Sequence, residues 1–237
     1  MAGLGSRFRS AGYDKPKPLI DVLGKPMYAW AADSLPLASS TKLIFILLSS
    51  QPEFQILRAD ILERYAAFNP IVLDVPELTP GQAITVLVAK DHINNDEPLL
   101  IHNADTAFDV EPGWAATLID QNADGGLLVF RSDEKRWSYS REDENGDVRE
   151  VREKEVISPW ASTGTYWFRR GSDFVSLAES RHTEGRKESG EYYVGPLYNE
   201  LISKDGIVRN CVIKKLLCFG TPEDLKTTLE ILSWKTA

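Results

Sequence analysis

Short apolar runs alternate with segments of helical periodicity in the first half of the chain. Residues 42–49 (KLIFILLS) are almost continuously apolar, as expected for a strand buried on both faces of a parallel sheet. Residues 52–68 follow with apolar side chains at helical spacing, and 71–75 form a second apolar run. The alternation continues with helices expected at 81–90 and 114–121 and strands at 97–102 and 125–130. This β-α-β-α order predicts a parallel sheet with right-handed crossovers.

The pattern changes after residue 130. Residues 131–155 are dense in charged and polar side chains and contain Asn145-Gly146, a hairpin signal. Residues 160–169 (WASTGTYWFR) are rich in aromatic and β-branched side chains and predict a strand. The remaining elements expected are helices at 172–181, 190–203 and 221–234 and a strand at 207–217. Thr221 can cap the last helix through its side-chain oxygen. Pro222 suits the first helical position, and the two acidic residues that follow suit the positive end of the helix dipole.

Composition describes an acidic globular protein. The chain has 237 residues, of which 43% are hydrophobic and 26% charged, so we expect one folded domain over residues 1–237 rather than a disordered chain. It has 27 Lys and Arg against 35 Asp and Glu, a formal net charge of −8. Because phosphate contacts need clustered cations, we expect no nucleic-acid partner. Small phosphorylated ligands held by a few local cations stay compatible with this charge.

Cysteine content and hydropathy indicate a reduced, cytoplasmic protein. Two thiols, Cys211 and Cys218, cannot form a disulfide scaffold or a four-ligand zinc site. The longest apolar stretch, residues 43–48, is far shorter than the roughly 20 residues that a membrane helix needs. The residues after Met1 lack the basic-then-apolar pattern of a secretory signal. We therefore expect a cytoplasmic location and no membrane insertion.

A glycine-rich stretch opens the chain and is followed by a lysine between prolines. In Gly3-Leu4-Gly5-Ser6-Arg7, two glycines allow close backbone approach to a ligand, and amides turned inward can bind an anion. Arg7 and Lys17, the latter in Pro16-Lys17-Pro18, add positive charge, so a triphosphate suits this stretch. The spacing fits neither a Walker loop nor the dinucleotide fingerprint. An ordinary loop is the alternative interpretation.

Two further motifs carry groups that suit phosphate chemistry. Asp105 follows the predicted strand 97–102, where a carboxylate can hold Mg²⁺, and a turn-forming aspartate is the alternative. In Val151-Arg152-Glu153-Lys154, Glu153 could accept hydrogen bonds from sugar hydroxyls and Lys154 could meet a phosphate. The alternative is that residues 131–155 form a solvated charged hairpin, with only Glu153 and Lys154 turned inward at its end.

Taken together, these motifs resemble the sugar-phosphate nucleotidyltransferases. The stretch MAGLGSRF…KPKPLIDVLGKPM is similar to the N-terminal signature of that family, and NADT, VREK, STGTYWF and CFGTPEDL follow in the family's order over nearly the whole chain. The resemblance implies an α/β fold, Rossmann-like with three α/β/α layers and a mixed, mainly parallel sheet of glycosyltransferase-A type. It also implies transfer of a nucleotidyl group from an NTP to a sugar 1-phosphate, with Mg²⁺ as cofactor and pyrophosphate as product.

The resemblance assigns roles to individual residues. The loop that cradles the triphosphate corresponds to Gly3, Leu4, Gly5, Ser6 and Arg7. Lys17 corresponds to the lysine that neutralises charge at the attacked α-phosphorus, so Arg7 and Lys17 are the candidate catalytic residues. Gly81 and Gln82 correspond to the segment that contacts the nucleobase, and Asp105 to the magnesium ligand. The acceptor pocket corresponds to Glu153, Lys154 and Gly164, with residues 131–170 contributing the hairpin region on that side.

The chain departs from the family pattern at two places. The family has an apolar strand that ends at the residues matching Met1-Ala2-Gly3, so the first strand is missing from this sequence. We expect the natural start to lie upstream, which an intact mass would test. Many family members also carry a second acidic metal ligand where Cys218 stands, and thiolate is a poor ligand for Mg²⁺. Asp105 would then work with water and phosphate oxygens, or with another carboxylate such as Glu191.

Three other functions stay open at this point. A cytidylyltransferase would use CTP and a non-sugar phosphomonoester. A non-catalytic relative would bind nucleotide and regulate a partner, for which the missing strand and Cys218 argue. A glycosyltransferase would prefer Asp-x-Asp where this chain has Asn103-Ala104-Asp105, and would not need Lys17. The sequence does not fix the nucleobase, the acceptor or the oligomeric state, and a homo-oligomer is compatible with it. We expect the product to serve polysaccharide biosynthesis.

Overall fold

The computed structural model describes residue 3 and residues 5–233. It divides into two compact units. The first takes the described parts of Met1–Leu78, Asn103–Asp109 and Lys215–Ala237, and the second comprises Thr79–His102 and Val110–Lys214. Each unit is therefore assembled from segments that are distant in sequence, and a single domain over residues 1–237 stays a prediction.

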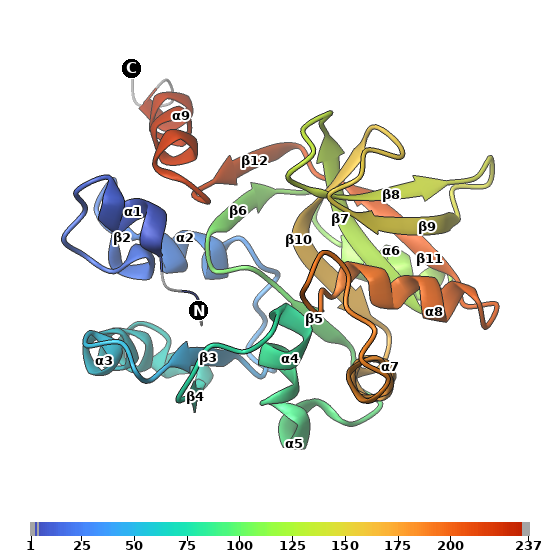
Figure 1. Ribbon diagram of the computed structural model, residues 1–237, viewed down its shortest axis with the longest axis horizontal. Coiled ribbons are helices and arrows are strands. Elements are labelled where there is room, and N and C mark those ends of the chain that lie inside the picture. The colour runs from blue at the N-terminus through green and yellow to red at the C-terminus, as the bar shows by residue number, and fades with distance from the viewer. Residues whose placement is uncertain (1–2, 4, 234–237) are drawn as a thin grey trace. The chain divides into compact units, whose positions relative to one another are not determined.

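A parallel strand pair organises one part of the first unit. β3 (Ile44–Leu48) lies parallel to β4 (Ile71–Val75), with Ile44 opposite Ile71 (Figure 1). α3 (Phe54–Arg64) and the 3-10 turn η2 (Ala66–Phe68) connect the two strands. The strand–helix–strand order predicted for residues 42–75 is thereby confirmed. Side chains from both strands, α3 and α2 (Met27–Asp33) fill one apolar core, which includes Tyr28, Phe45, Leu47, Leu57, Ile61 and Tyr65.

An antiparallel strand pair organises the other part of the first unit. β6 (Thr106–Asp109) pairs with β12 (Lys215–Cys218), and α9 (Pro222–Ser233) follows β12. The predicted cap is confirmed and is reciprocal: Asp224 N–H donates to Thr221 Oγ1 at 3.1 Å, and Thr221 N–H donates to the Asp224 carboxylate at 3.0 Å. The last predicted helix residue, Trp234, lies outside the described residues.

Short N-terminal elements complete this unit. They are α1 (Ser6–Ser10), η1 (Lys17–Leu19), β1 (Asp21–Val22) and β2 (Lys25–Pro26). Their apolar side chains join those of β6 and α9 in a second core, which includes Phe8, Ile20, Val22, Met27, Phe219 and Leu225. Burial of Phe8, which is 1% exposed, holds the glycine-rich stretch against this core.

The second unit contains a mixed six-stranded sheet. Its strands are β5 (Leu99–Ile101), β7 (Gly125–Arg131), β8 (Ser138–Glu142), β9 (Val148–Glu153), β10 (Trp160–Phe168) and β11 (Val208–Val212). The order is β11-β7-β10-β8-β9, and β5 pairs with another part of β10. β11 runs parallel to β7, whereas β10 is antiparallel to β5, β7 and β8. The mixed α/β character agrees with the expected fold class.

Helices pack on this sheet and on each other. They are α4 (Gln82–Leu87), α5 (Lys90–Ile93), α6 (Trp114–Asp120), α7 (Gly171–Thr183), η3 (Gly195–Leu197) and α8 (Tyr198–Ile202). α7 contacts α4, α5 and β10, and α8 lies along β9 (Figure 1). In the part of the chain that the structure describes, no helix has both the length and the apolar character to cross a bilayer.

Three predicted elements differ from those observed. The helix expected at 81–90 is two short helices, α4 and α5. The helix expected at 190–203 begins only at residue 195, because main-chain groups of residues 188–192 bond to each other and to residues 80–83. The strand expected at 207–217 is two strands, β11 and β12, in different units. An apolar run of that length does not reveal that its two halves pair with different strands.

Candidate active site

Gly5 stands at the start of α1 in the left-handed conformation, with φ 61° and ψ 25°. A Cβ atom at Gly5 would lie 3.0 Å from the Cβ of Lys17, so the glycine-rich stretch passes directly over that lysine. Ser6 and Arg7 are exposed. The carbonyl of Gly3 accepts a hydrogen bond from Gln51 Nε2 at 2.8 Å. Leu4 lies outside the described residues.

Lys17 is the centre of a polar cluster in the first unit, which we call the Lys17 cluster (Gly5, Lys17, Asp105 and Gly220). Its Nζ donates to Asp105 Oδ2 at 2.5 Å and to the Gly220 carbonyl at 2.9 Å. The Lys17 side chain is 18% exposed and that of Asp105 is 33% exposed. The fold therefore joins two predicted site residues that are 88 positions apart in sequence. An ammonium has three N–H donors, so a third can go to a ligand oxygen while both contacts persist.

The β6–β12 pair fixes the carboxylate of this cluster. Asp105 directly precedes β6, and its carbonyl accepts the Phe219 amide proton at 2.9 Å. Cys218 pairs with Thr106, and the Cys218 carbonyl accepts a hydrogen bond from Thr228 Oγ1 at 2.7 Å. The residue at position 218 thus lies opposite Thr106, the residue that follows Asp105.

The oxygen donors of the Lys17 cluster fit a hard divalent cation. Mg²⁺ is commonly held by one or two carboxylates together with substrate phosphates and water, and Asp105 offers one partly exposed carboxylate. Among the described residues, no three His, Cys, Asp or Glu side chains gather into a metal-binding group. The role of Asp105 as a magnesium ligand stays a prediction. A contribution from Glu191 stays a prediction.

The turn at Gly81 requires glycine. Gly81 has φ 134° and ψ 166°, and a Cβ there would lie 2.5 Å from both the N and the O of Tyr192. The Tyr192 amide donates to the Pro80 carbonyl, and the Ala83 amide donates to the Tyr192 carbonyl, both at 2.9 Å. Gln82 follows as the first residue of α4 and is half-buried.

Glu153, the last residue of β9, belongs to a second polar cluster, which we call the Glu153 cluster (Ser138, Glu153, Lys154, Tyr193). Its carboxylate accepts a hydrogen bond from Ser138 Oγ. Burial raises the pKa of Glu153, and the Ser138 hydrogen bond and the positive charge of Lys154 offset part of that effect. Glu153 is thus a carboxylate of limited solvation that can accept hydrogen bonds from a ligand.

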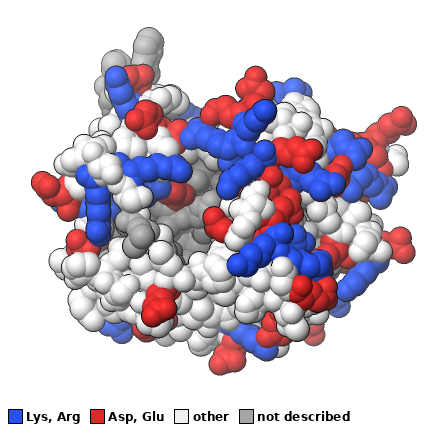
Figure 2. All heavy atoms as spheres, viewed as in Figure 1, with Lys and Arg blue, Asp and Glu red and all other residues white. Residues whose placement is uncertain are grey.

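Lys154 leaves the strand in the left-handed conformation, with φ 59°. Its Nζ donates to the hydroxyl of Tyr193 at 2.8 Å, and this hydrogen bond raises the pKa of Lys154. The side chain is exposed rather than turned inward, which corrects that expectation for Lys154. The rest of hairpin β8–β9 is charged, with ion pairs such as Arg141–Glu150 at 2.5 Å and Arg152–Glu150 at 2.7 Å. Figure 2 shows acidic and basic side chains interspersed where Figure 1 places these strands.

Gly164 forms a bulge in β10. Its φ is 80°, its amide donates to Ser162 Oγ at 3.1 Å, and the pairing of β10 with β7 shifts between Ser162 and Tyr166. Tyr166 is buried, which raises its pKa to about 12, and the charge of Glu153 adds to that rise. Gly164 is thus in the strand that carries Tyr166 to the Glu153 cluster.

Comparison with known proteins identifies the family of the chain. The family model described as Nucleotidyl transferase matches residues 1–195. The chain belongs to this family. The UTP–glucose-1-phosphate uridylyltransferase AglF of Haloferax volcanii is 28% identical to it over 230 residues, covering 94% of this chain and 90% of the relative. The nucleotidyltransferase described here is therefore an enzyme of a group-transfer family.

Solved structures show the same fold. The nucleoside-diphosphate-sugar pyrophosphorylase of Vibrio cholerae RC9 is 27% identical, with a TM-score of 0.85 and coverage of 97% of this chain and 98% of that one. A glucose-1-phosphate thymidylyltransferase described as putative, from Bacillus anthracis, reaches a TM-score of 0.76 at 19% identity, with coverage of 97% and 92%. The inositol-1-phosphate CTP transferase of T. maritima reaches 0.71 at 15% identity, with coverage of 97% and 93%. These similarities confirm the expected α/β fold class.

Sequence reasoning missed several partners of the predicted residues in this nucleotidyltransferase. The Ser138 contact could have been found in the sequence, because a two-residue turn at Asn145-Gly146 would place Ser138 opposite Glu153. The hairpin closes instead between Asp143 and Asp147, and a register shift between Arg141 and Glu142 restores that pairing. Tyr193 and Glu188 carry no motif that distinguishes them in the sequence. Their contacts arise only from the fold.

Replacing Glu153 by glutamine should stabilise the nucleotidyltransferase at neutral pH but not in acid. Burial raises the folded-state pKa above the ordinary 4.5. Between the unfolded-state and folded-state pKa values, the Glu153 carboxyl loses its proton in the unfolded chain but keeps it in the folded protein. As pH rises through this range, the stability of wild type therefore falls relative to that of Glu153→Gln. Urea unfolding at pH 4 and pH 7 measures the difference.

A matched carboxylate provides the control for this pH trend. Hydrogen bonds from Arg141 and Arg152 lower the pKa of Glu150, so Glu150→Gln should lose stability relative to wild type as pH rises. Equal pH trends for Glu153→Gln and Glu150→Gln would contradict the assignment of a poorly solvated carboxylate at position 153.

Proposed function

We propose that this chain transfers a nucleotidyl group from an NTP to a sugar 1-phosphate, releasing pyrophosphate and forming a nucleotide sugar. The observation that carries the proposal is the pairing of Lys17 with Asp105 beneath the turn at Gly5. Family membership and the relative from Haloferax volcanii support it, and they make UTP and glucose 1-phosphate the first substrate pair to test. We expect the reaction in the cytoplasm, with the product consumed in glycosyl transfer to polysaccharide.

The proposed chemistry needs no general base. An oxygen of the acceptor phosphate attacks the α-phosphorus of the NTP, the bond from that phosphorus to the bridging oxygen of the β-phosphate breaks, and pyrophosphate leaves. Because the acceptor phosphate is already an anionic nucleophile, the barrier comes from bringing two polyanions together in line. Catalysis is then positioning and charge neutralisation.

The first unit supplies the groups for the triphosphate. Lys17 holds a positive charge for the phosphate oxygens at the reacting centre, and exposed Arg7 adds a second cation. Mg²⁺, held by Asp105, would neutralise phosphate charge when bound. The Gly220 carbonyl and Asp105 keep the Lys17 ammonium in one place, so little reorganisation is needed when phosphate charge develops.

The second unit supplies groups for the nucleobase and the acceptor. Gly81 and Gln82 form the turn proposed to contact the base. In the Glu153 cluster, Glu153 accepts hydrogen bonds from sugar hydroxyls and Lys154 binds the acceptor phosphate, while the bulge at Gly164 lets the backbone approach the sugar closely.

Pyrophosphate release tests the proposal. UTP, CTP, ATP, GTP and dTTP are each combined with a panel of sugar 1-phosphates and non-sugar phosphomonoesters, with Mg²⁺ or with EDTA. We expect release with one NTP and a sugar 1-phosphate, and loss of release with EDTA. Release only with CTP and a non-sugar phosphomonoester would favour a cytidylyltransferase instead. Nucleotide binding without release from any pair would favour a non-catalytic, regulatory role.

A further inference from the structure

A tight turn in the second unit contacts Glu153 and Lys154, the two residues predicted to bind the acceptor substrate, which we call the acceptor pair. Glu188 and Glu191 form an antiparallel bridge, with N–H···O distances of 2.9 and 3.0 Å. Between them, Ser189 and Gly190 have φ of 47° and 88°, as in the two-residue turns of hairpins. We call residues 188–193 the 188–193 turn. Its main chain is held by these hydrogen bonds and by those of Tyr192 to Pro80 and Ala83.

The two ends of the 188–193 turn bond to Glu153 and Lys154. At one end, Glu188 Oε1 accepts the main-chain amide of Glu153 at 3.1 Å. At the other end, the Tyr193 hydroxyl accepts a hydrogen bond from Lys154 Nζ at 2.8 Å, and that ammonium lies 5.1 Å from the centre of the Tyr193 ring. Glu153 and Lys154, which are adjacent in sequence, are thus bonded to opposite ends of one turn.

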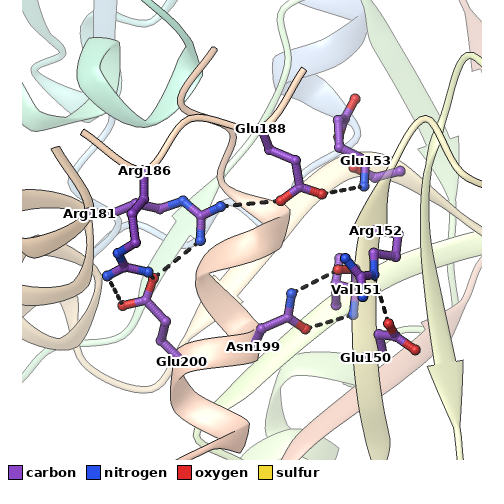
Figure 3. A network of polar contacts seen from close by, with 10 residues as sticks. Glu150, Val151, Arg152, Glu153, Arg181, Arg186, Glu188, Asn199 and Glu200 are labelled. Atoms are coloured by element: carbon purple, nitrogen blue, oxygen red, sulfur yellow. Dashed lines mark hydrogen bonds and ion pairs between the residues drawn. The ribbon is translucent and has the colours of Figure 1, made fainter. Parts of the chain in front are cut away.

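A charged network anchors the Glu188 end. Arg181, 11% exposed, donates to Glu188 Oε2 at 3.2 Å and to Glu200 Oε1 at 3.2 Å. Arg186 also donates to Glu200, at 2.8 Å. Figure 3 shows the Glu188 carboxylate between the guanidinium of Arg181 and the amide of Glu153, with both oxygens engaged. Charged groups removed from water in this way keep one arrangement, because losing a partner leaves a poorly solvated charge.

The strand that carries Glu153 is held beside this network. Asn199, on α8, accepts the Val151 amide through Oδ1 and donates to the Val151 carbonyl through Nδ2, both at 2.8 Å. Figure 3 shows this pair of bonds next to the Glu188 contact. The end of β9 is therefore bonded on its free edge by side chains instead of by another strand.

The ammonium of Lys154 stands on a long, exposed side chain, and Tyr193 restrains it. The Lys154 side chain has four rotatable bonds, and fixing it against phosphate costs rotamer entropy when nothing restrains it beforehand. The hydroxyl and the ring of Tyr193 restrain it in the free protein. Preorganisation of this kind strengthens ligand binding by reducing the entropy lost on binding.

We propose that Glu188 and Tyr193 are positioning residues for the acceptor: Glu188 fixes Glu153 through its main-chain amide, and Tyr193 fixes the ammonium of Lys154 where the acceptor phosphate binds. This inference rests on the proposed function, which assigns Glu153 and Lys154 to the acceptor. Neither residue acts on the reacting atoms. Their loss therefore weakens acceptor binding more than it slows the chemical step.

Tyr193→Phe tests the Lys154 half of the proposal, because it removes only the hydroxyl and keeps the ring. We expect the KM for the sugar 1-phosphate to rise about tenfold, the effect of one hydrogen bond to a charged group, while kcat and the KM for the NTP change less than about threefold. Tyr139→Phe is the matched control, since that hydroxyl donates to the main-chain carbonyl of Glu134 and not to the acceptor pair. An unchanged acceptor KM in Tyr193→Phe would overturn this half.

Glu188→Ala and Glu188→Gln test the other half. The alanine variant lacks the side-chain oxygen to which the Glu153 main-chain amide donates. The glutamine variant keeps a side-chain amide oxygen that can accept the same hydrogen bond. We expect the acceptor KM to rise about tenfold in Glu188→Ala and to recover most of the way in Glu188→Gln. Glu184→Ala is the control, because Glu184 pairs with Arg186 on the surface but does not touch Glu153. Equal KM values in all three variants would overturn the Glu188 assignment.

Hydrogen exchange separates this inference from the proposed function. The Glu153 amide should exchange at least about tenfold faster in Glu188→Ala than in wild type or Glu184→Ala, whatever the enzyme turns over. If wild type releases no pyrophosphate with any substrate pair, the proposed function falls, and the exchange rate still decides whether Glu188 holds Glu153. Equal exchange in wild type and Glu188→Ala would contradict the inference even in an active enzyme.

Discussion

Lys17→Ala should slow turnover by at least ~100-fold, the scale seen when one preorganised electrostatic group is removed from an active site. In wild type, the Lys17 ammonium lies 2.5 Å from the Asp105 carboxylate and 2.9 Å from the Gly220 carbonyl, so its charge is held in one position. Alanine removes that charge, and nothing else in the Lys17 cluster replaces it. Steady-state rates of pyrophosphate release at saturating NTP and acceptor measure the effect.

Lys15→Ala is the matched control for this loss of charge. Lys15 is exposed, lies two positions before Lys17 and carries the same side chain. We expect its turnover to stay within about threefold of wild type, in the ordinary range for a surface substitution. Circular dichroism of both variants checks that the fold is kept. Near-normal turnover of folded Lys17→Ala would remove the basis for the proposed mechanism.

Gly81→Ala should destabilise the second unit by about 3 kcal/mol, because overpacking against main-chain atoms cannot be relieved by side-chain rotation. The new Cβ would lie 2.5 Å from the N and O of Tyr192, and φ 134° with ψ 166° is a region open essentially to glycine alone. Urea unfolding measures the change. We also expect the KM for the NTP to rise, since the turn proposed to contact the base has to move.

Gly113→Ala separates strain from overpacking. Gly113 also has positive φ, 84°, but no atom lies within 4 Å of the position its Cβ would take. The substitution should therefore cost only about 1 kcal/mol, the price of the left-handed conformation for a residue with a Cβ. If Gly81→Ala is no more destabilising than Gly113→Ala, the close approach of Tyr192 to Gly81 is wrong.

Strong local patterns predicted the elements that depend on few partners. The apolar runs at 44–48 and 71–75 became β3 and β4, which pair with each other, because short apolar runs of that length favour strands. The aromatic and β-branched run at 160–168 became β10 for the same reason. The Asn145-Gly146 signal correctly predicted a hairpin in a region whose charges gave no other indication of strands.

Elements whose boundaries depend on distant partners could not be predicted. β6 is only four residues long and exists because β12, more than a hundred positions later, pairs with it. Residues 190–194 were predicted to begin a helix, but Gly190 lies in a turn with φ 88°, and the main chain of Tyr192 is bonded to Pro80 and Ala83. Local propensity is a weak guide where such tertiary bonds decide the backbone.

The candidate site shows the same division. Lys17 and Asp105 were predicted from motifs and from the family resemblance, and the structure brings the two side chains together. Glu153 was predicted to turn inward at a hairpin end, and in the structure it is half-buried. Tyr193 and Glu188 were not predicted, because a single sequence carries no signal for contacts that depend on the placement of a turn.

Phosphorus NMR of one reaction tests the central claim most directly. Wild-type protein is mixed with UTP, glucose 1-phosphate and Mg²⁺, and the phosphorus-containing products are followed in time. The account predicts equal amounts of pyrophosphate and of a sugar nucleotide with two coupled phosphorus signals, and neither product in Lys17→Ala over the same period. UDP and orthophosphate in place of these products would show hydrolysis of the NTP, and would contradict nucleotidyl transfer to a sugar phosphate.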